Sequence, residues 1–140
     1  MFTIDTSSDF GKRIARQLDD EKVLWLTTVA KSGTPAPKPV WYLWRDGQIL
    51  VSSQPGTAKV QHVVSRPRVS LNFNATHTGG EVGVLTGDAA IDDNGLTPEE
   101  LAAYNAKYAD DISRLGMTPD QFHASYSVLV RITPDNLRGF

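Results

Sequence analysis

The segment 52–59, SSQPGTAK, holds residues whose types and spacing suit the binding of an anion. Two hydroxyls end a predicted strand, Gln-Pro-Gly makes a turn, and Thr57 can N-cap a following helix with Lys59 in its first turn. Free N–H groups at a helix start, a hydroxyl and a cation together form an anion site. A lysine there opposes the helix dipole unless an anion such as phosphate binds. A capping threonine and a solvated lysine explain this segment equally well.

Lys38 is the second residue of interest, because it lies between Pro37 and Pro39 in the segment 36–44, APKPVWYLW. The prolines stiffen the chain and leave carbonyl groups without partners, which suits a planar heterocycle with N–H donors and a phosphate tail. Prolines also prevent an edge strand from pairing with another chain, and the charge of Lys38 would oppose such pairing as well. For this segment alone, edge protection is the simpler interpretation.

The charges of the chain are divided between its middle and its flanks. Residues 31–80 contain six Lys or Arg and one Asp or Glu, a net charge of +5, whereas the rest has eight bases against fifteen acids, a net charge of −7. The overall charge of −2 hides this division. We expect the basic middle to face an anion.

Several classes of function are excluded or disfavoured by composition. The chain has no cysteine, which excludes disulfides, thiolate metal sites and cysteine nucleophiles. His62, His77 and His123 lack metal-ligand spacing, so we predict no metal site. A pI near 5.9 disfavours nucleic acid as a partner. No segment has the length and hydrophobicity of a membrane span or a signal peptide, so we expect a cytoplasmic protein without a membrane partner.

The residue patterns predict one domain, residues 1–140, that combines helices and strands. Short amphipathic helices are predicted after Ser7 or Ser8, after Thr57, after Thr97 with Leu101, Tyr104 and Tyr108 on its apolar face, and after Thr118. Strands are predicted at 23–29, 36–44, 49–53, 68–73, 82–91 and 126–132, with an Asp-Gly hairpin at 45–48 and a bend or bulge at Gly87. This order indicates an α+β fold, mainly β, in which an antiparallel barrel-like sheet has helices at its ends.

Aromatic side chains are concentrated on two neighbouring predicted strands, at Trp25, Trp41, Tyr42 and Trp44. They could line a ligand groove or a subunit interface. Ordinary core packing is the alternative, and it is favoured for Trp25 and for one of Trp41 and Trp44.

Taken together, residues 23–73 resemble the pyridoxamine phosphate oxidase-like, FMN-binding split β-barrel superfamily. The matching features are Pro-Val-Trp-Tyr after a strand and a turn, the Asp-Gly hairpin, Thr-Ala-Lys, and a strand that begins Arg-Pro-Arg-Val. The helical segment 97–118 and the ending VRITPDNLRGF are most similar to the actinobacterial branch that uses the deazaflavin coenzyme F-420.

The resemblance implies a homodimeric split barrel with the cofactor in a groove between subunits. It places cofactor contacts at Lys38, Pro39, Val40, Trp41, Ser52, Ser53, Gln54, Thr57, Ala58 and Lys59. Tyr126 and Arg138 are candidates for closing the site of the partner subunit. The chain lacks the arginine- and histidine-rich substrate motifs of pyridoxamine phosphate oxidases. We therefore do not expect it to oxidise pyridoxine phosphate.

The resemblance also implies a function that needs no catalytic residue of the protein, because the cofactor itself carries the hydride. We expect an oxidoreductase that binds F-420, or alternatively FMN, and transfers a hydride to a small organic acceptor. The alternative is a non-catalytic protein that stores or senses flavin or haem in the same groove.

Overall fold

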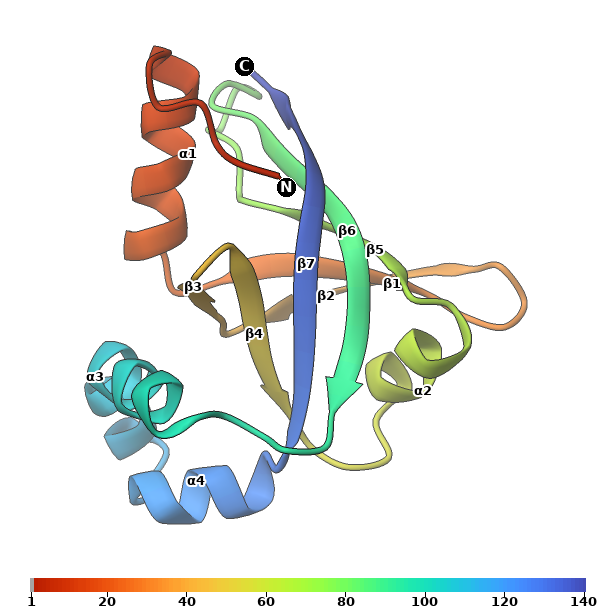
Figure 1. Cartoon of the computed structure of the whole chain (residues 1–140), viewed down its shortest axis with the longest axis vertical. Helices are drawn as coiled ribbons and strands as arrows, with labels where there is room; N and C mark the ends of the chain where they lie inside the picture. Colours follow the sequence, from red (N-terminus) through yellow and green to blue (C-terminus); the bar gives the residue numbers. More distant parts are fainter. Residues whose placement is uncertain (1) are drawn as a thin grey trace.

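A computed structural model describes residues 2–140 and shows one curled, seven-stranded antiparallel sheet with four helices around it (Figure 1). The elements follow the chain in the order α1 (Asp9–Asp20), β1 (Leu24–Val29), β2 (Pro35–Val40), β3 (Leu43–Arg45), β4 (Gln48–Ser53), α2 (Ala58–Ser65), β5 (Arg68–Asn72), β6 (Gly83–Asp92), α3 (Pro98–Arg114), α4 (Pro119–Ser125) and β7 (Val128–Gly139). The strand order is β2-β1-β5-β6-β7-β4-β3. The predicted α+β class with an antiparallel, barrel-like sheet is confirmed.

The two edges of the sheet are neighbours in the chain, since only Trp41 and Tyr42 separate β2 from β3. So short a link requires the sheet to curl until its edges approach each other. The prediction of one strand over residues 36–44 was therefore wrong. The backbone leaves the ladder at Tyr42, whose N–H donates to the Tyr108 hydroxyl (2.8 Å) and whose carbonyl accepts from Lys107 Nζ (3.0 Å).

The last strand is longer than predicted, because β7 continues through residues 133–139 beside β6. The predicted strand ended at residue 132, whereas in the structure Pro134 still lies in the strand, opposite Gly87 at a β-bulge. A Cβ built on Gly87 would lie 2.3 Å from the Thr133 carbonyl oxygen, so only glycine allows this approach. The predicted irregularity at Gly87 is confirmed, and it is what lets a proline occupy an inner strand.

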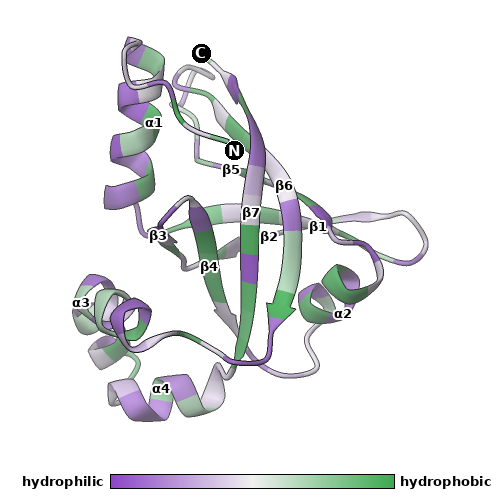
Figure 2. Cartoon of the chain, viewed as in Figure 1, coloured by the Kyte–Doolittle hydropathy of each residue, from purple (hydrophilic) through white to green (hydrophobic). Residues whose placement is uncertain are grey.

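Two hydrophobic clusters lie on opposite faces of the curled sheet. Ile49 and Val51 of β4 face the barrel interior, whereas Leu50 faces a second cluster formed with α3 and α4. This is the period-two alternation of a strand that is covered on both faces. Figure 2 shows hydrophobic residues along β4 and the lower part of β7, and both hydrophobic and polar residues on the helices.

The helices begin as predicted. Ser8 caps α1, while Thr97 and Thr118 form capping boxes at α3 and α4. Leu101, which was predicted on the apolar face of its helix, is 37% exposed, so that assignment was wrong. No helix within residues 2–140 is long and apolar enough to cross a membrane.

Candidate functional site

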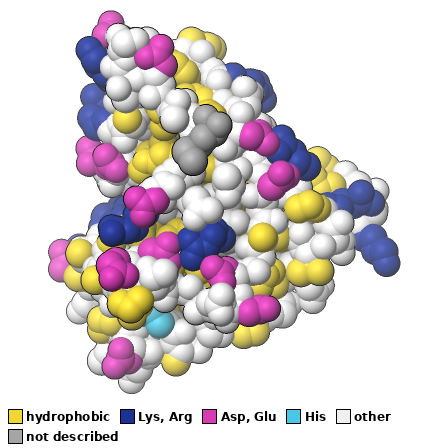
Figure 3. All heavy atoms as spheres, viewed as in Figure 1, with side chains coloured by type: hydrophobic (Ala, Val, Ile, Leu, Met, Phe, Trp, Pro, Cys, Tyr) yellow, Lys and Arg dark blue, Asp and Glu magenta, His cyan; other side chains and the backbone are white. Residues whose placement is uncertain are grey.

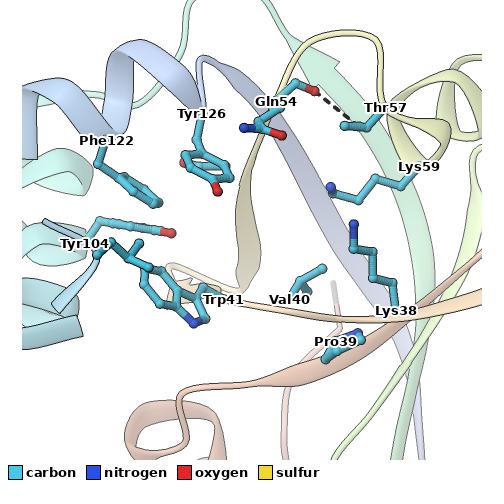
Figure 4. Close-up of a pocket in the computed structure, with 12 residues that line it drawn as sticks. Lys38, Pro39, Val40, Trp41, Gln54, Thr57, Lys59, Tyr104, Phe122 and Tyr126 are labelled. Atoms are coloured by element: carbon cyan, nitrogen blue, oxygen red, sulfur yellow. Dashed lines mark hydrogen bonds between the residues drawn. The ribbon is translucent and has the colours of Figure 1, made fainter. Parts of the chain in front are cut away.

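One pocket, of about 290 Å³, brings together eight of the ten residues predicted to bind the cofactor. They are Lys38, Pro39, Val40, Trp41, Ser52, Gln54, Thr57 and Lys59. The pocket also contains four side chains that sequence reasoning did not assign to this chain's own site, namely Tyr104, Leu115, Phe122 and Tyr126. It lies between β2, β4, the start of α2 and the two C-terminal helices (Figure 4).

The pocket has a cationic end, formed by Lys38 of β2 and Lys59 of α2. Their ammonium groups point toward each other in Figure 4. Neither lysine forms an ion pair with a carboxylate within residues 2–140. Desolvation lowers the pKa of the Lys59 ammonium below its ordinary value, and the positive charge of Lys38 lowers it further. An anion placed between the two lysines would relieve both effects.

The start of α2 differs from the starts of α3 and α4, although all three helices have threonine at the N-cap. The Thr97 and Thr118 hydroxyls accept hydrogen bonds from the backbone N–H groups of Glu100 and Gln121 (both 3.2 Å). The Thr57 hydroxyl instead donates to the Gln54 carbonyl (3.2 Å) and caps no N–H. The first-turn N–H groups of α2 therefore stay available beside Lys59.

Strand β2 forms the edge of the sheet, as its prolines predicted, and pairs only with β1. Proline occurs at alternate positions, 35, 37 and 39. Because proline has no N–H, these residues must turn their backbone polar groups away from β1. The open side of β2 consequently offers carbonyl oxygens with no competing N–H along three alternate positions. Such an edge can accept hydrogen bonds from the N–H groups of a planar ring.

The opposite end of the pocket is aromatic. Trp41 stacks on Tyr108 with the ring centroids 4.7 Å apart and an angle of 11° between the planes, and on Phe122 at 5.6 Å. Phe122 stacks in turn on Tyr126 at 4.5 Å. Trp41 belongs to the link between β2 and β3, whereas the other three rings belong to α3, α4 or the residue after α4. These stacked pairs hold the rings in fixed positions.

The hydroxyl of Tyr104 has no hydrogen-bond partner within residues 2–140, although the residue is only 1% exposed. Figure 4 shows it pointing into the pocket. Burial raises the pKa of this phenol well above its ordinary value and Tyr108 adds to the rise, while a weak hydrogen-bonding interaction with the Ser52 side chain, too poor in geometry to count as a hydrogen bond, opposes it. Leaving such a group unpaired costs about 1–3 kcal/mol.

Two of the ten predicted cofactor-binding residues, Ser53 and Ala58, lie outside the pocket lining. Ser53 is fully buried on the opposite face of β4 from Ser52, so its side chain does not line the pocket. Ala58 is exposed outside the lining, and only its backbone belongs to the helix start. Tyr126, expected to close the partner's site, lines the pocket of its own chain. Arg138 pairs with Val84 near the C-terminal end of β7, at the far end of the strand from α4 (Figure 1).

The three arginines of the segment 31–80 have local roles. Arg68 pairs with Asp88 (3.2 Å) and Asp135, and Arg66 donates to the Lys31 carbonyl (2.8 Å). Arg45 lies 3.8 Å from Asp46 in the hairpin turn. Figure 3 shows that bases and acids are mixed over much of the visible face, with bases gathered where the molecule projects at the right. Lys38 and Lys59 are thus the two bases of this segment that face the pocket.

The geometry defines a class of protein, a split β-barrel with a small-molecule pocket that is cationic at one end and aromatic at the other. The chain belongs to the pyridoxamine 5'-phosphate oxidase family, whose sequence pattern matches residues 10–139. A search of curated proteins found no match by sequence.

Solved structures with the same fold have diverse descriptions. A conserved hypothetical protein from Mycobacterium tuberculosis is 22% identical, with 94% of this chain and 82% of that chain covered and a TM-score of 0.65. The haem storage protein HutZ from Vibrio cholerae is 16% identical, with 91% and 92% covered and a TM-score of 0.63. An F-420 reductase is 17% identical, with 88% and 94% covered and a TM-score of 0.61. At these identities the likeness concerns the fold.

Proposed function

We propose that this protein is an oxidoreductase that holds F-420, or alternatively FMN, in the pocket and delivers a hydride to a small organic acceptor. One observation carries the proposal: two unpaired lysines and an uncapped helix start lie in the same pocket as an aromatic platform. A cofactor with a phosphate at one end and a planar ring at the other matches this arrangement.

Three features of the pocket fit such a cofactor. Lys38, Lys59 and the first N–H groups of α2 would hold the phosphate. The open edge of β2 at Pro39 and the neighbouring Trp41 would orient the ring. Tyr104, Phe122 and Tyr126 line the same pocket and would add further apolar contacts to the ring. When bound, the cofactor supplies the hydride, so the protein's part is to bind, orient and exclude water.

The proposal includes a homodimer in the cytoplasm. A volume of about 290 Å³ is at the lower limit of small-molecule pockets, which run from about 300 to 1,000 Å³. Pro37, Lys38 and Pro39 are exposed beside the pocket, so a second copy of the chain could cover this side. A subunit interface across the pocket would supply the missing wall.

The alternative function is storage or sensing of flavin or haem without turnover. It is supported by the fold shared with HutZ and by the lack of an acid–base pair among the residues that line the pocket. Haem iron is commonly held by histidine, and no histidine lines this pocket, which favours a flavin-type ligand.

Purification without added cofactor, followed by absorbance and mass spectrometry of the released material, tests the proposal. Protein that is empty should then be titrated with F-420 and FMN side by side. F-420 carries a glutamate tail in addition to its phosphate, so its affinity should fall more steeply with salt than that of FMN. Oxidation of the reduced cofactor in the presence of an acceptor supports an enzyme. Tight binding without turnover across a broad acceptor panel supports storage.

A further inference from the structure

The link between β2 and β3 is held by two side chains of α3. Lys107 Nζ donates to the Tyr42 carbonyl oxygen (3.0 Å), and the Tyr108 hydroxyl lies 2.9 Å from the same oxygen. The Tyr42 N–H donates to that hydroxyl (2.8 Å). Both polar backbone groups of Tyr42 are therefore bound by α3 rather than by a neighbouring strand. The contacts that hold Tyr42 also hold the residue before it, Trp41.

Trp41 connects these contacts to the pocket. Its ring lines the pocket (Figure 4) and stacks on Tyr108, with the centroids 4.7 Å apart. Lys107 does not line the pocket, and its ammonium group lies 3.7 Å from the centroid of the Tyr42 ring and 5.3 Å from that of Tyr108. A cation placed over aromatic faces is attracted to them. Lys107 therefore acts on the pocket through Tyr42 and Trp41.

The charge of Lys107 is not balanced by a direct partner. Lys107 forms no ion pair with a carboxylate within residues 2–140. Glu21 carries a nearby negative charge, yet one oxygen of its carboxylate is buried and has no hydrogen-bond partner in the described part of the chain. Burial lowers the pKa of the Lys107 ammonium to about 8. Its proton is thus lost in the mildly alkaline range.

The charged groups around Lys107 come from the end of α1 and from α3. The charge of Lys22 contributes to the lowering of the pKa, whereas three acids oppose it, namely Asp19, Asp20 and Glu21. Lys22 Nζ is itself paired with Asp111 of α3 (2.8 Å). The two phenols in contact with Lys107 stay protonated, because burial raises the pKa of both Tyr42 and Tyr108.

We propose that Lys107 is a positioning residue, whose ammonium group holds the Tyr42 carbonyl and thereby fixes the Trp41 ring in the pocket wall. Loss of the proton leaves a neutral amine, which makes a weaker hydrogen bond to the carbonyl and has no cation–π attraction to the Tyr42 ring. The Trp41 ring then becomes more mobile. This inference concerns the free protein, and it rests on the proposed function only where a flavin serves as the probe.

A local change at Trp41 differs from unfolding in its dependence on pH. Folding lowers the pKa of Lys107, so between about pH 8 and 10.5 the unfolded chain binds more protons at this residue than the folded protein does. The contribution of Lys107 to the free energy of unfolding therefore rises with pH in this window. Mobility of Trp41 should increase around pH 8 without a loss of stability from this residue.

The first test measures acrylamide quenching of tryptophan fluorescence in the free, full-length protein from about pH 7 to about pH 9.5, which brackets the pKa of Lys107. Quenching of the wild type should rise with a midpoint near pH 8. Trp41→Phe should lose this transition, which identifies the reporter among the three tryptophans. Lys107→Met keeps the apolar stem, and its quenching should be high already at neutral pH. Lys107→Arg, which stays charged, should keep the quenching low throughout.

Neighbouring charges provide matched variants. Lys22→Met removes a positive charge that lowers the pKa of Lys107, so the midpoint should move to higher pH. Glu21→Gln removes a negative charge that opposes the lowering, so the midpoint should move to lower pH. A purely structural role of Lys107 would not give shifts of opposite sign. Urea denaturation checks that each variant is folded over the range of the titration.

The second test uses FMN and inorganic pyrophosphate as probes at neutral pH. Lys107→Met should bind FMN about two- to tenfold more weakly than the wild type, because the Trp41 side chain must be ordered again on binding. Its affinity for pyrophosphate, which needs only the cationic end, should not change.

The positioning role is overturned if the quenching transition persists in Lys107→Met or is missing in the wild type. Equal FMN affinity of these two proteins would overturn the claim that the position of Trp41 matters to a ligand. If FMN binds to neither protein, the proposed function fails for that cofactor, and the quenching experiment still decides the role of Lys107.

Discussion

The two ends of the pocket are built in opposite ways. The cationic end consists of two lysines without carboxylate partners and a helix start without a side-chain cap. The aromatic end consists of rings that are stacked on one another and tied to the hydrophobic cluster under α3 and α4. The cationic end therefore lowers stability until an anion arrives, whereas the aromatic end contributes to folding before any ligand binds. The cationic end thus contributes mainly to ligand binding, and the aromatic end contributes mainly to folding.

Phe122→Ala should have the largest effect, and it should disrupt the aromatic end of the pocket without changing the cationic end. Phe122 is 2% exposed and stacks on Trp41, Tyr104 and Tyr126, so its loss should lower the free energy of unfolding by about 3 kcal/mol. Urea denaturation measures this change. Leu101→Ala, on the exposed side of α3, is the control and should cost far less. Below the transition, Phe122→Ala should keep its affinity for inorganic pyrophosphate at the cationic end. Loss of that affinity would show that the two ends are not separable.

Lys59→Ala should have the converse effect. Removing one partner of a charge-assisted hydrogen bond to phosphate should weaken cofactor binding by about ten- to a hundredfold. Stability should stay constant or rise slightly, because the repulsion between Lys59 and Lys38 disappears. Fluorescence titration and thermal unfolding measure the two quantities. Lys31→Ala removes an exposed lysine in the β1–β2 turn and is the control. Unchanged cofactor affinity in Lys59→Ala would reject the phosphate assignment.

Two matched substitutions on α3 should differ in their effect on the free energy of unfolding. Tyr108→Phe leaves the Tyr42 N–H without its buried partner, so it should lower the free energy of unfolding by about 1–3 kcal/mol. Tyr104→Phe removes a hydroxyl that has no partner and should leave stability unchanged or slightly raised. Denaturation of both variants under one condition checks the difference. Equal destabilisation would mean that the Tyr104 hydroxyl is satisfied in the free protein.

The smallest effect concerns pH. The pKa of Lys59 is lowered in the free protein, and a bound phosphate should raise it again, so binding takes up a proton. Cofactor affinity should be fully present below the free-protein pKa and should fall as pH rises from that value toward the pKa of the complex. Titrations from neutral to alkaline pH measure this fall. Lys59→Arg, which stays charged, should flatten the dependence. An affinity that rises with pH would contradict the proposed charge pairing.

The cationic end could be predicted from sequence because its features are local. Strand end, turn and helix start all fall within eight residues, and the prolines of β2 define an edge without knowledge of the partner strands. Ser53 could also have been placed correctly, since two consecutive residues of a strand point to opposite faces and Ser52 already faced the pocket.

The aromatic end could not be predicted in the same way. It joins Trp41 to Tyr104, Phe122 and Tyr126 across more than sixty positions of chain, and nothing local specifies that contact. The division of the segment 36–44 into two strands depends on Tyr108, which binds the backbone of Tyr42 from another element. The length of β7 depends on Gly87 of β6. In each case the deciding partner lies far away in sequence.

The link of Trp41 and Tyr42 between the two edge strands has a consequence for how the molecule opens. β2 and β3 are farthest apart in the sheet order but adjacent in the chain, so movement at the link affects both edges together. A ligand that stacks on Trp41 should therefore slow amide hydrogen exchange in β2 and β3 in parallel, although β3 does not line the pocket. Hydrogen exchange in both edge strands of the sheet would then depend on whether the pocket is occupied.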